Sequence, residues 1–345
     1  MEESLYKSYK AELEAKLEAY YQRADLFNVI ELLENSELDF DLCMELVRTY
    51  INVANKSGDP YTLYEKATVV LEKNAIAGRD DPRWLFYKGY ILYRQGLVED
   101  ALIRFERALK FASVADGALF TNICTMAENC KNEVKLSSFK GMNEANLPLY
   151  DEHLKKHFGK TSKFCSFNGV EVLLAEPNEE HKYFLLITRG LSGKDLKADD
   201  GSTEHLEIAL ALPEDYRFSE DQEKNFEVYM FIEIAKHLIC ADRYTGFGYY
   251  LKRDQSFSAH TAFTGAMLSA LGDFKKDASF FKNSNGEDVI FYEVLPLRPM
   301  EVSYRDTHSA YELLERFKEK LIMLTPFIST RDDAVQTLFR SKEGL

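Results

Sequence analysis

Residues 183–216 read YFLLITRGLSGKDLKADDGSTEHLEIALALPEDY, two apolar runs on either side of a polar loop. Residues 183–188 are rich in aromatic and β-branched side chains, which is typical of a buried strand. This run ends at Gly190, which lacks a Cβ and allows a backbone turn that most residues resist. The second run, residues 206–212, closes on Pro213, which cannot donate a hydrogen bond to a neighbouring strand. We therefore expect two strands of a sheet covered on both faces, joined by a loop that binds a partner.

The composition is that of an ordinary globular protein with room for two domains. Of the 345 residues, 46% are hydrophobic and 29% are charged, so the chain can build a sizeable core. The formal net charge of −14 argues against a nucleic-acid-binding surface and suits a basic partner. The five cysteines are an odd number without a Cys-x-x-Cys pair, which favours a reducing compartment. Because no segment reaches the roughly 18 apolar residues of a membrane span, we expect a cytoplasmic protein that does not enter a membrane.

The first 140 residues read as a series of amphipathic helices. Residues 3–22 place apolar side chains at helical spacing, with lysines and glutamates on the opposite face. Similar patterns follow at residues 25–33, 39–54, 63–71, 83–93, 98–111 and 117–134. They group into helix pairs that recur about every 34–38 residues, which indicates a repeat architecture.

The third helix pair is the most specific of the series. Residues 82–113 read PRWLFYKGYILYRQGLVEDALIRFERALKFAS. This segment resembles a tetratricopeptide repeat, whose small and aromatic positions fall at Gly89, Gly96, Ala101, Phe105 and Ala108. In such a repeat the small residues let two helices cross closely, and Gly96 allows the tight turn between them. The sequence departs from the family at Lys88, an apolar position, and at Ser113, where the family has proline.

The resemblance implies that residues 1–140 form a tetratricopeptide-like helical repeat domain. About three repeats and a capping helix are present, near the minimum for a stable stack. Such stacks bind extended peptides or helices on a concave surface. The alternative is that these helices only support the second domain or form a dimer contact, and the sequence leaves the oligomeric state open.

The second half of the chain mixes strands with helices. Residues 136–147 lose the helical period and mark the boundary between two domains. Asn168–Gly169 lies between two short apolar runs, which is a hairpin signal. Beyond residues 183–216, we expect a helix at 226–238, strands at 263–268 and 289–295, and a helix at 311–324 that Ser309 caps. This pattern predicts an α/β (α+β) domain with a mixed sheet and flanking helices.

Several of these segments together resemble the suppressor-of-fused (SUFU) domain. In order, they are ITRGLS at 187–192, HLEIALALPEDY at 205–216, the helix at 232–238, TGFG at 245–248, AFTGA at 262–266, VIFYEVLPL at 289–297 and the helix at 311–321. The resemblance spans roughly residues 146–325 and implies a second domain at 146–330. It implies a mixed sheet with packed helices and no catalytic role.

The resemblance also implies what the chain does. A eukaryotic member sequesters a transcription factor by clasping a peptide strand, and bacterial members are immunity proteins that neutralise toxins. This chain has a helical-repeat front end and no second eukaryotic lobe, which favours the bacterial type. We therefore expect a non-enzymatic immunity protein that sequesters another protein, and the acidic charge suits a basic toxin such as a nuclease. One alternative is a scaffold in which the repeats bind the partner.

Two segments of the second domain are the candidate binding sites. The polar loop at 193–203 contributes Lys194, Asp195 and Asp199. The aromatic segment YTGFGYY contributes Tyr244, Phe247, Tyr249 and Tyr250, and the following loop contributes His260. Tyrosine and phenylalanine give large contact areas at low entropic cost, so these side chains suit a partner-binding rim. The alternative is that the aromatic side chains plug one end of the sheet.

Residues for catalysis, metals and cofactors are not indicated. His153 and His157 lie at i and i+4, but no third ligand follows at a predictable spacing, so a solvated helix face is the expected role. Gly246-Phe-Gly248 lacks the context of a dinucleotide-binding loop. An enzyme would need a site assembled from His260, Asp242 and Glu293, and the sequence shows no nucleophile–base pair among them. We expect no cofactor and no catalytic residue.

Overall fold

The computed structural model describes residues 2–197, 203–242, 245–272 and 274–335. The chain divides into two compact units, Met1–Val134 and Lys135–Leu345, which we call unit 1 and unit 2. Each unit is described by itself. None of the described helices is long and apolar enough to cross a membrane.

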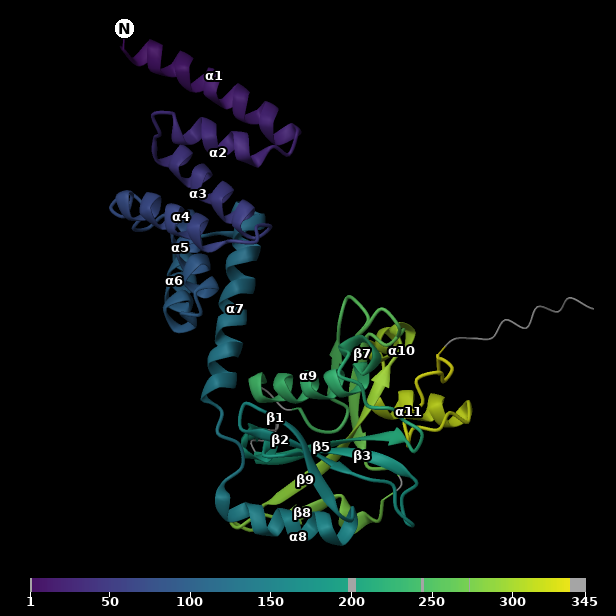
Figure 1. The fold of residues 1–345 in the computed structure, drawn as a ribbon. Coiled ribbons are helices and arrows are strands. Elements are labelled where there is room, and N and C mark those ends of the chain that lie inside the picture. The colour runs from purple at the N-terminus through teal and green to yellow at the C-terminus, as the bar shows by residue number, and fades with distance from the viewer. Residues whose placement is uncertain (1, 198–202, 243–244, 273, 336–345) are drawn as a thin grey trace, which may run out of the picture. The chain divides into compact units, whose positions relative to one another are not determined.

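Unit 1 is built from helices (Figure 1). They are α1 (Glu2–Gln22), α2 (Leu26–Glu34), α3 (Phe40–Ala54), α4 (Tyr61–Lys73), α5 (Pro82–Arg94), α6 (Val98–Phe111), the 3₁₀ helix η1 (Val114–Asp116) and α7 (Ala118–Ser138), which runs past the unit boundary. Asp25, Asp39 and Asp81 cap three of these helices, because each carboxylate accepts a hydrogen bond from a backbone amide of the first turn. The sequence placed the last helix at 117–134, and α7 continues to Ser138.

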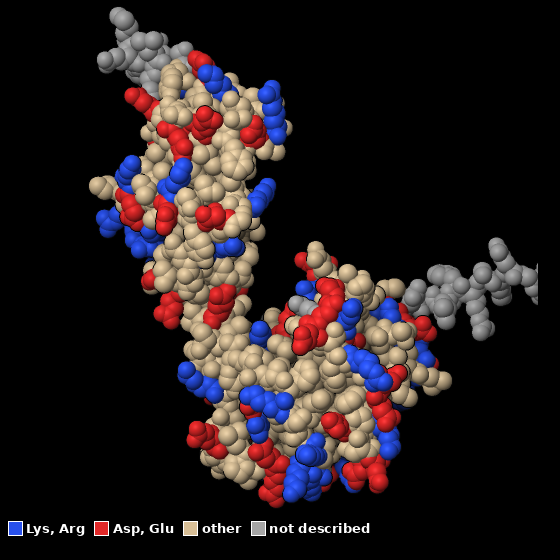
Figure 2. Space-filling view, viewed as in Figure 1, with Lys and Arg blue, Asp and Glu red and all other residues tan. Residues whose placement is uncertain are grey.

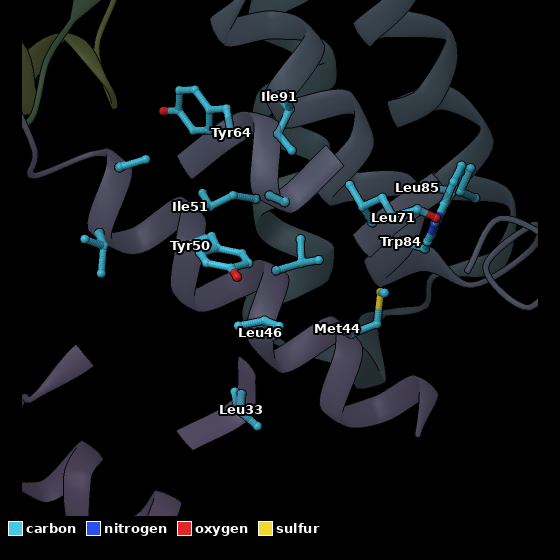
Figure 3. Close-up of a cluster of buried hydrophobic side chains, with 14 of the residues drawn as sticks. Leu33, Met44, Leu46, Tyr50, Ile51, Tyr64, Leu71, Trp84, Leu85 and Ile91 are labelled. Atoms are coloured by element: carbon cyan, nitrogen blue, oxygen red, sulfur yellow. The ribbon is translucent and has the colours of Figure 1, made fainter. Parts of the chain in front are cut away.

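The helix pair at residues 82–113 packs as its small residues predict. A Cβ on Gly89 would lie 2.9 Å from Cε1 of Phe105, so the glycine lets α5 and α6 approach closely. Ala101, Phe105 and Ala108 are fully buried. Gly96 has a φ of +79°, which permits the turn between the two helices. Figure 3 shows the core around α3 to α5, where the Trp84 indole donates a hydrogen bond to the Leu71 carbonyl at 2.8 Å.

The described residues of unit 2 form a nine-stranded mixed sheet. Its strands are β1 (Thr161–Phe167), β2 (Val170–Ala175), β3 (Tyr183–Arg189), β4 (Leu196–Lys197), β5 (Thr203–Pro213), β6 (Tyr250–Lys252), β7 (Gly265–Ala270), β8 (Phe280–Lys282) and β9 (Asp288–Leu297). The order is β1-β2-β3-β5-β9-β7-β6, with β4 beside β5 and β8 beside β9. The β5–β9 pair is parallel and the other pairs are antiparallel. The unit also contains η2 (Glu144–Asn146), α8 (Leu147–His157), η3 (Leu191–Gly193), η4 (Gln222–Lys224), α9 (Phe226–Cys240), η5 (Lys276–Ala278), α10 (Pro299–Arg305) and α11 (Ala310–Glu319).

Helices cover both faces of the sheet, as the apolar runs predict (Figure 1). Along β5, Ile208 and Leu210 belong to the core beneath α9, whereas Ala209 and Ala211 belong to the core beneath α8. This alternation follows from the two-residue period of a strand. On β9, the residues of the α8 face continue into a further cluster beneath α10 and α11. The α8 helix and the α10–α11 pair therefore cover the two ends of one face, and α9 covers the other.

Element boundaries differ from the sequence expectation at several places. β7 begins two residues after the expected strand at 263–268, because Phe263 leaves the sheet to pack on Phe226 and Phe327. α11 ends at Glu319 rather than at residue 324. Its expected cap is confirmed, since Ser309 and Glu312 form a reciprocal capping box. The loop at 193–203 is shorter than expected, because Leu196 and Lys197 pair with the start of β5.

Candidate functional site

The predicted binding residues fall into two groups at opposite ends of β9. Lys194 and Asp195 follow η3, which belongs to the end where His205 of β5 pairs with Val289 of β9. Tyr250 begins β6 and pairs with Met267 of β7, which in turn pairs with Leu295 of β9. Six residue steps of extended strand lead from Val289 to Leu295, or about 20 Å at 3.3 Å per residue. The structure therefore does not bring the two groups together into one site.

At the first end, a buried carboxylate organises the turn after β3. Glu207 of β5 is fully buried and accepts hydrogen bonds from the amides of Gly190 (2.9 Å), Leu191 (3.2 Å) and Ser192 (3.0 Å). The Ser192 hydroxyl donates a fourth, at 2.7 Å. Burial raises the pKa of Glu207, against hydrogen bonds from Thr188, Ser192 and Gly190, which lower it. The polar loop thus starts from a rigid turn.

The two described loop residues of this group are differently placed. Lys194 is half-buried, and its amide closes η3 by donating to the Leu191 carbonyl. Asp195 is exposed, and its Oδ1 lies 3.8 Å from Nδ1 of His205. The same histidine approaches Glu287 on its other side, at 3.3 Å from Nε2. Asp199, the third predicted residue of this loop, lies outside the described residues.

At the second end, β6 is joined to α10 by a polar contact. The Tyr250 hydroxyl donates to Oδ1 of Asp306 at 2.7 Å, and the Lys252 ammonium donates to the same carboxylate at 2.9 Å. The hydrogen bond to the carboxylate raises the pKa of Tyr250, and both donors lower the pKa of Asp306. The Arg305 guanidinium lies 5.0 Å from the Tyr250 ring centroid and donates to the carbonyl of Gly248 at 2.9 Å. These contacts hold the aromatic segment in one position.

Further aromatic side chains extend this end of the unit. The ring of Phe247 lies 4.8 Å from the ring of Tyr311, which is 69% exposed. Tyr304 and His308 stack with centroids 3.8 Å apart, and the Arg316 guanidinium lies 5.8 Å from the Tyr304 ring centroid. We call the whole set the β6–α11 surface: Phe247, Tyr250, Lys252, Tyr304, Arg305, Asp306, His308 and Tyr311.

The remaining predicted residues lie outside this surface. The Tyr249 ring is half-buried, with its centroid 6.1 Å from that of His237 on α9. His260 is exposed in the loop between β6 and β7, and its amide donates to the Ser258 hydroxyl. Tyr244 lies outside the described residues.

Residues named for an enzyme have structural partners. The buried carboxylate of Glu293 accepts hydrogen bonds from the Thr325 hydroxyl (2.6 Å) and the Gly272 amide (3.2 Å). Asp242 forms an ion pair with Lys135 at 2.6 Å. His153 packs its ring on Phe291 and shares a hydrogen bond with the Ala278 carbonyl, so it is a core histidine rather than a solvated one. Across the described ranges, no group of three His, Cys, Asp or Glu side chains is arranged to hold a metal ion.

Sequence reasoning missed the α10–α11 half of the surface. Tyr304, Asp306 and Tyr311 lie more than fifty residues from β6, and no local pattern connects them with Phe247 and Tyr250. One signal was present: Tyr311 falls next to the Ser309 cap, at a position that a buried helix stripe does not require. The packing of the aromatic segment against the start of α11 also explains why residue 248 is a glycine. A Cβ at this position would lie 2.9 Å from Cβ of Ala310.

Unit 1 carries a groove of its own. It has a volume of about 430 Å³ and lies between α3, α5 and α7. Aromatic and amide side chains line it: Phe86, Tyr87, Tyr90, Asn52, Asn55 and Asn122. Among its described lining residues, Arg48 is the single charged one. The Asn55 carbonyl oxygen accepts hydrogen bonds from Tyr64 and Tyr90, so this amide is held in place.

Comparisons with known proteins concern unit 2. No curated protein sequence matches the chain. Among solved structures, a SUFU homologue from Neisseria gonorrhoeae is 17% identical, with a TM-score of 0.42 over 56% of this chain and 97% of its own. A structure described as the Sufu–Fu complex is 10% identical, with a TM-score of 0.42 over 56% of this chain and 93% of the other. Drosophila Suppressor of Fused is 9% identical, with a TM-score of 0.39 over 55% of this chain and 51% of its own.

One protein-family model matches part of the chain. The model described as Suppressor of fused protein (SUFU) matches residues 167–325. The matched segment begins at the last residue of β1, runs through α11 and includes both ends of β9. The match to the SUFU family model therefore lies within unit 2.

Proposed function

We propose that this chain is a non-enzymatic binding protein that sequesters another protein through the β6–α11 surface. The observation that carries the proposal is the pairing of a largely exposed Tyr311 with Phe247 on an immobilised aromatic segment. Aromatic side chains beside arginine are the residues that dominate binding energy at protein interfaces. Because a hydrogen bond to Asp306 already holds Tyr250, a partner loses little entropy by ordering this side chain.

The SUFU domain supports a partner-binding role rather than a catalytic one. The resemblance to this family implies sequestration of a protein, and the carboxylates of Asp242 and Glu293 are engaged in structural contacts. Figure 2 shows acidic and basic side chains interspersed over the visible face of unit 2, so the β6–α11 surface would supply its affinity mainly through its aromatic side chains. The net charge of −14 would then speed the approach of a basic partner.

The concrete form that we propose is a bacterial immunity protein that acts in the cytoplasm on a basic toxin. The test is co-expression with any toxin that is encoded beside this chain, followed by titration of the purified proteins. The proposal expects growth protection and a 1:1 complex whose association slows as the salt concentration rises. Absence of both protection and binding would rule out the immunity role.

The groove of unit 1 favours a second candidate, an adaptor whose tetratricopeptide-like repeats capture the partner. Amide side chains such as Asn52 and Asn122 can bind the main chain of an extended peptide, and the tyrosines can pack on its side chains. Two full-length variants separate the candidates. Asn52→Ala with Asn122→Ala would abolish capture by an adaptor, whereas Tyr311→Ala would abolish capture by the β6–α11 surface.

A further inference from the structure

The segment after α11 lies along the body of unit 2 without forming a described helix or strand. We call residues 325–335 the strap. The Thr325 hydroxyl binds Glu293, the Phe327 amide donates to the Ala211 carbonyl at 2.9 Å, and the Ala334 amide donates to Oε1 of Glu301 at 2.8 Å. Between these anchors, Ile328, Ser329 and Thr330 are exposed. The strap is therefore held at separate points rather than by a continuous ladder of hydrogen bonds.

The main anchor of the strap is Arg331. Its guanidinium meets Glu301 in a bidentate pair, with Nη1 at 2.6 Å from Oε1 and Nη2 at 2.6 Å from Oε2. Nη2 also donates to the Pro296 carbonyl at 2.8 Å. The side chain of Arg331 is 6% exposed and that of Glu301 is 0% exposed, so the pair is shielded from water. Two planar N–H···O bonds give such a pair both strength and geometric specificity.

Aromatic rings complete the site around this guanidinium. Its carbon lies 4.8 Å from the ring centroid of Phe317 and 5.2 Å from that of Phe263. A cation over an aromatic face is attracted by the ring quadrupole, most strongly where water is excluded. Carboxylate, carbonyl and rings together recognise an arginine by charge, by hydrogen-bond direction and by shape. A lysine would lose the bidentate pairing.

None of these recognition groups belongs to the strap. Glu301 comes from α10, Phe317 from α11, Pro296 from β9 and Phe263 from the loop before β7. If the strap opened, Glu301 would lose its pair with Arg331 and keep the amide of Arg298 as a donor, so a replacement arginine would restore the bidentate pair. The Arg298 guanidinium, 4.9 Å from the Phe263 ring centroid, would stay beside the site. Opening would require release of these polar anchors and of the Phe327 ring, which packs on Phe226 and Phe263 in the core beneath α9, whereas the strands of the sheet are held along their length.

We propose that the strap is an intramolecular ligand and that Arg331 occupies a site built to receive the arginine of a partner segment. This site lies beneath the strap. The inference does not depend on which protein binds the β6–α11 surface. A tethered ligand has an effective concentration in the millimolar range, so a lone arginine does not displace the strap. A partner segment must add contacts of its own to the arginine before it replaces Arg331.

The test uses the full-length chain with Arg331→Ala and the probe N-acetyl-L-arginine amide. We expect this variant to unfold at a lower temperature than wild type. Millimolar probe should recover at least half of the lost melting temperature, and N-acetyl-L-lysine amide should recover none. The matched control is Arg316→Ala, which removes an exposed arginine of α11 that pairs with Glu319. Neither compound should change the melting temperature of this variant. If the arginine probe recovered none of the lost melting temperature, or if the lysine compound recovered as much, the proposed arginine site would be wrong.

Hydrogen exchange of the wild-type chain tests the release of the strap, and it remains informative if Arg331→Ala does not fold. The amides of Phe327 and Ala334 report two anchors directly. We expect both to exchange at least tenfold faster than the protected amides of β9, because the strap opens without unfolding of the sheet. Exchange of these two amides at the rate of β9 would show that the segment is a fixed part of the core.

Discussion

The carboxylate of Glu207 on β5 binds Ser192 twice, accepting from its amide at 3.0 Å and from its hydroxyl at 2.7 Å. A single buried side chain thus holds the turn from which the polar loop departs. Glu207→Ala would leave the buried amides of Gly190, Leu191 and Ser192 without this acceptor. We expect the variant to lose about 3 kcal/mol of unfolding free energy in urea titrations, because unmade buried hydrogen bonds cost about 1–3 kcal/mol each and part of the loss is recovered by relaxation.

The control for Glu207 is Glu214, an exposed carboxylate just past the end of the same strand. Glu214→Ala should change the unfolding free energy by less than about 0.5 kcal/mol. If both variants were equally stable, Glu207 would not organise the turn.

Acidification should destabilise unit 2 through α8. Burial lowers the pKa of His153 and of His157 below the ordinary value, and their ring centroids lie 4.6 Å apart. The facing groups are Lys156 on α8 and Lys275 and Asp277 at η5. Because the folded pKa values are lower than the unfolded ones, the unfolded chain binds more protons as the pH falls below about 6.5. Their contribution to stability is complete above that pH and is lost as the pH falls toward the folded pKa values.

Urea unfolding at pH 7.5 and at pH 5.5 measures this loss. His153→Gln should reduce the difference between the two conditions, since glutamine does not titrate and its amide can still donate to the Ala278 carbonyl. His260→Gln, which changes an exposed loop histidine, should leave the difference as in wild type. If the unfolding free energy of His153→Gln depended on pH as strongly as that of wild type, His153 would not be a source of the acid destabilisation.

Close helix packing in unit 1 should make Gly89 intolerant of a side chain. The Cβ of Gly89→Ala would lie 2.9 Å from Cε1 of Phe105 and 3.1 Å from Cβ of Arg104. We expect a loss of about 1–3 kcal/mol, since overpacking a dense core forces a shift of its neighbours. Thermal unfolding followed by circular dichroism provides the measurement.

Gly58→Ala is the matched control, because nothing lies within 4 Å of a Cβ at that position. Stability in this variant should stay the same or rise slightly. Equal effects at the two glycines would mean that the α5–α6 crossing does not depend on Gly89.

Local patterns predicted much of this fold. The buried runs at β3, β5 and β9, the Ser309 cap and the close helix crossing at Gly89 could be read directly, because each depends on residues near in sequence or on a regular period. Glu207 is different. It is a lone acidic residue in the apolar run HLEIALAL, and a carboxylate there must find hydrogen-bond donors, yet the sequence does not say that they come from residues 190–192.

Long-range contacts account for what the sequence left out. Phe247 meets Tyr311, and Glu301 meets Arg331, across separations that no periodicity spans. The sequence also grouped the polar loop and the aromatic segment as candidate sites without indicating their distance. Only the order β5-β9-β7-β6 shows that they lie at opposite ends of one strand.

The central claim is that the β6–α11 surface binds the partner, and the affinity of Tyr311→Ala tests it most directly. The measurement is calorimetric titration of the full-length chain with the partner protein identified by the co-expression test, for wild type, Tyr311→Ala, Tyr61→Ala and Asn52→Ala. Tyr61 is a matched control on unit 1, with 64% of its surface exposed. We predict that Tyr311→Ala weakens binding at least tenfold, or about 1.4 kcal/mol, while Tyr61→Ala and Asn52→Ala stay within twofold of wild type. Wild-type affinity in Tyr311→Ala together with loss of binding in Asn52→Ala would contradict the account and assign the partner to the groove of unit 1.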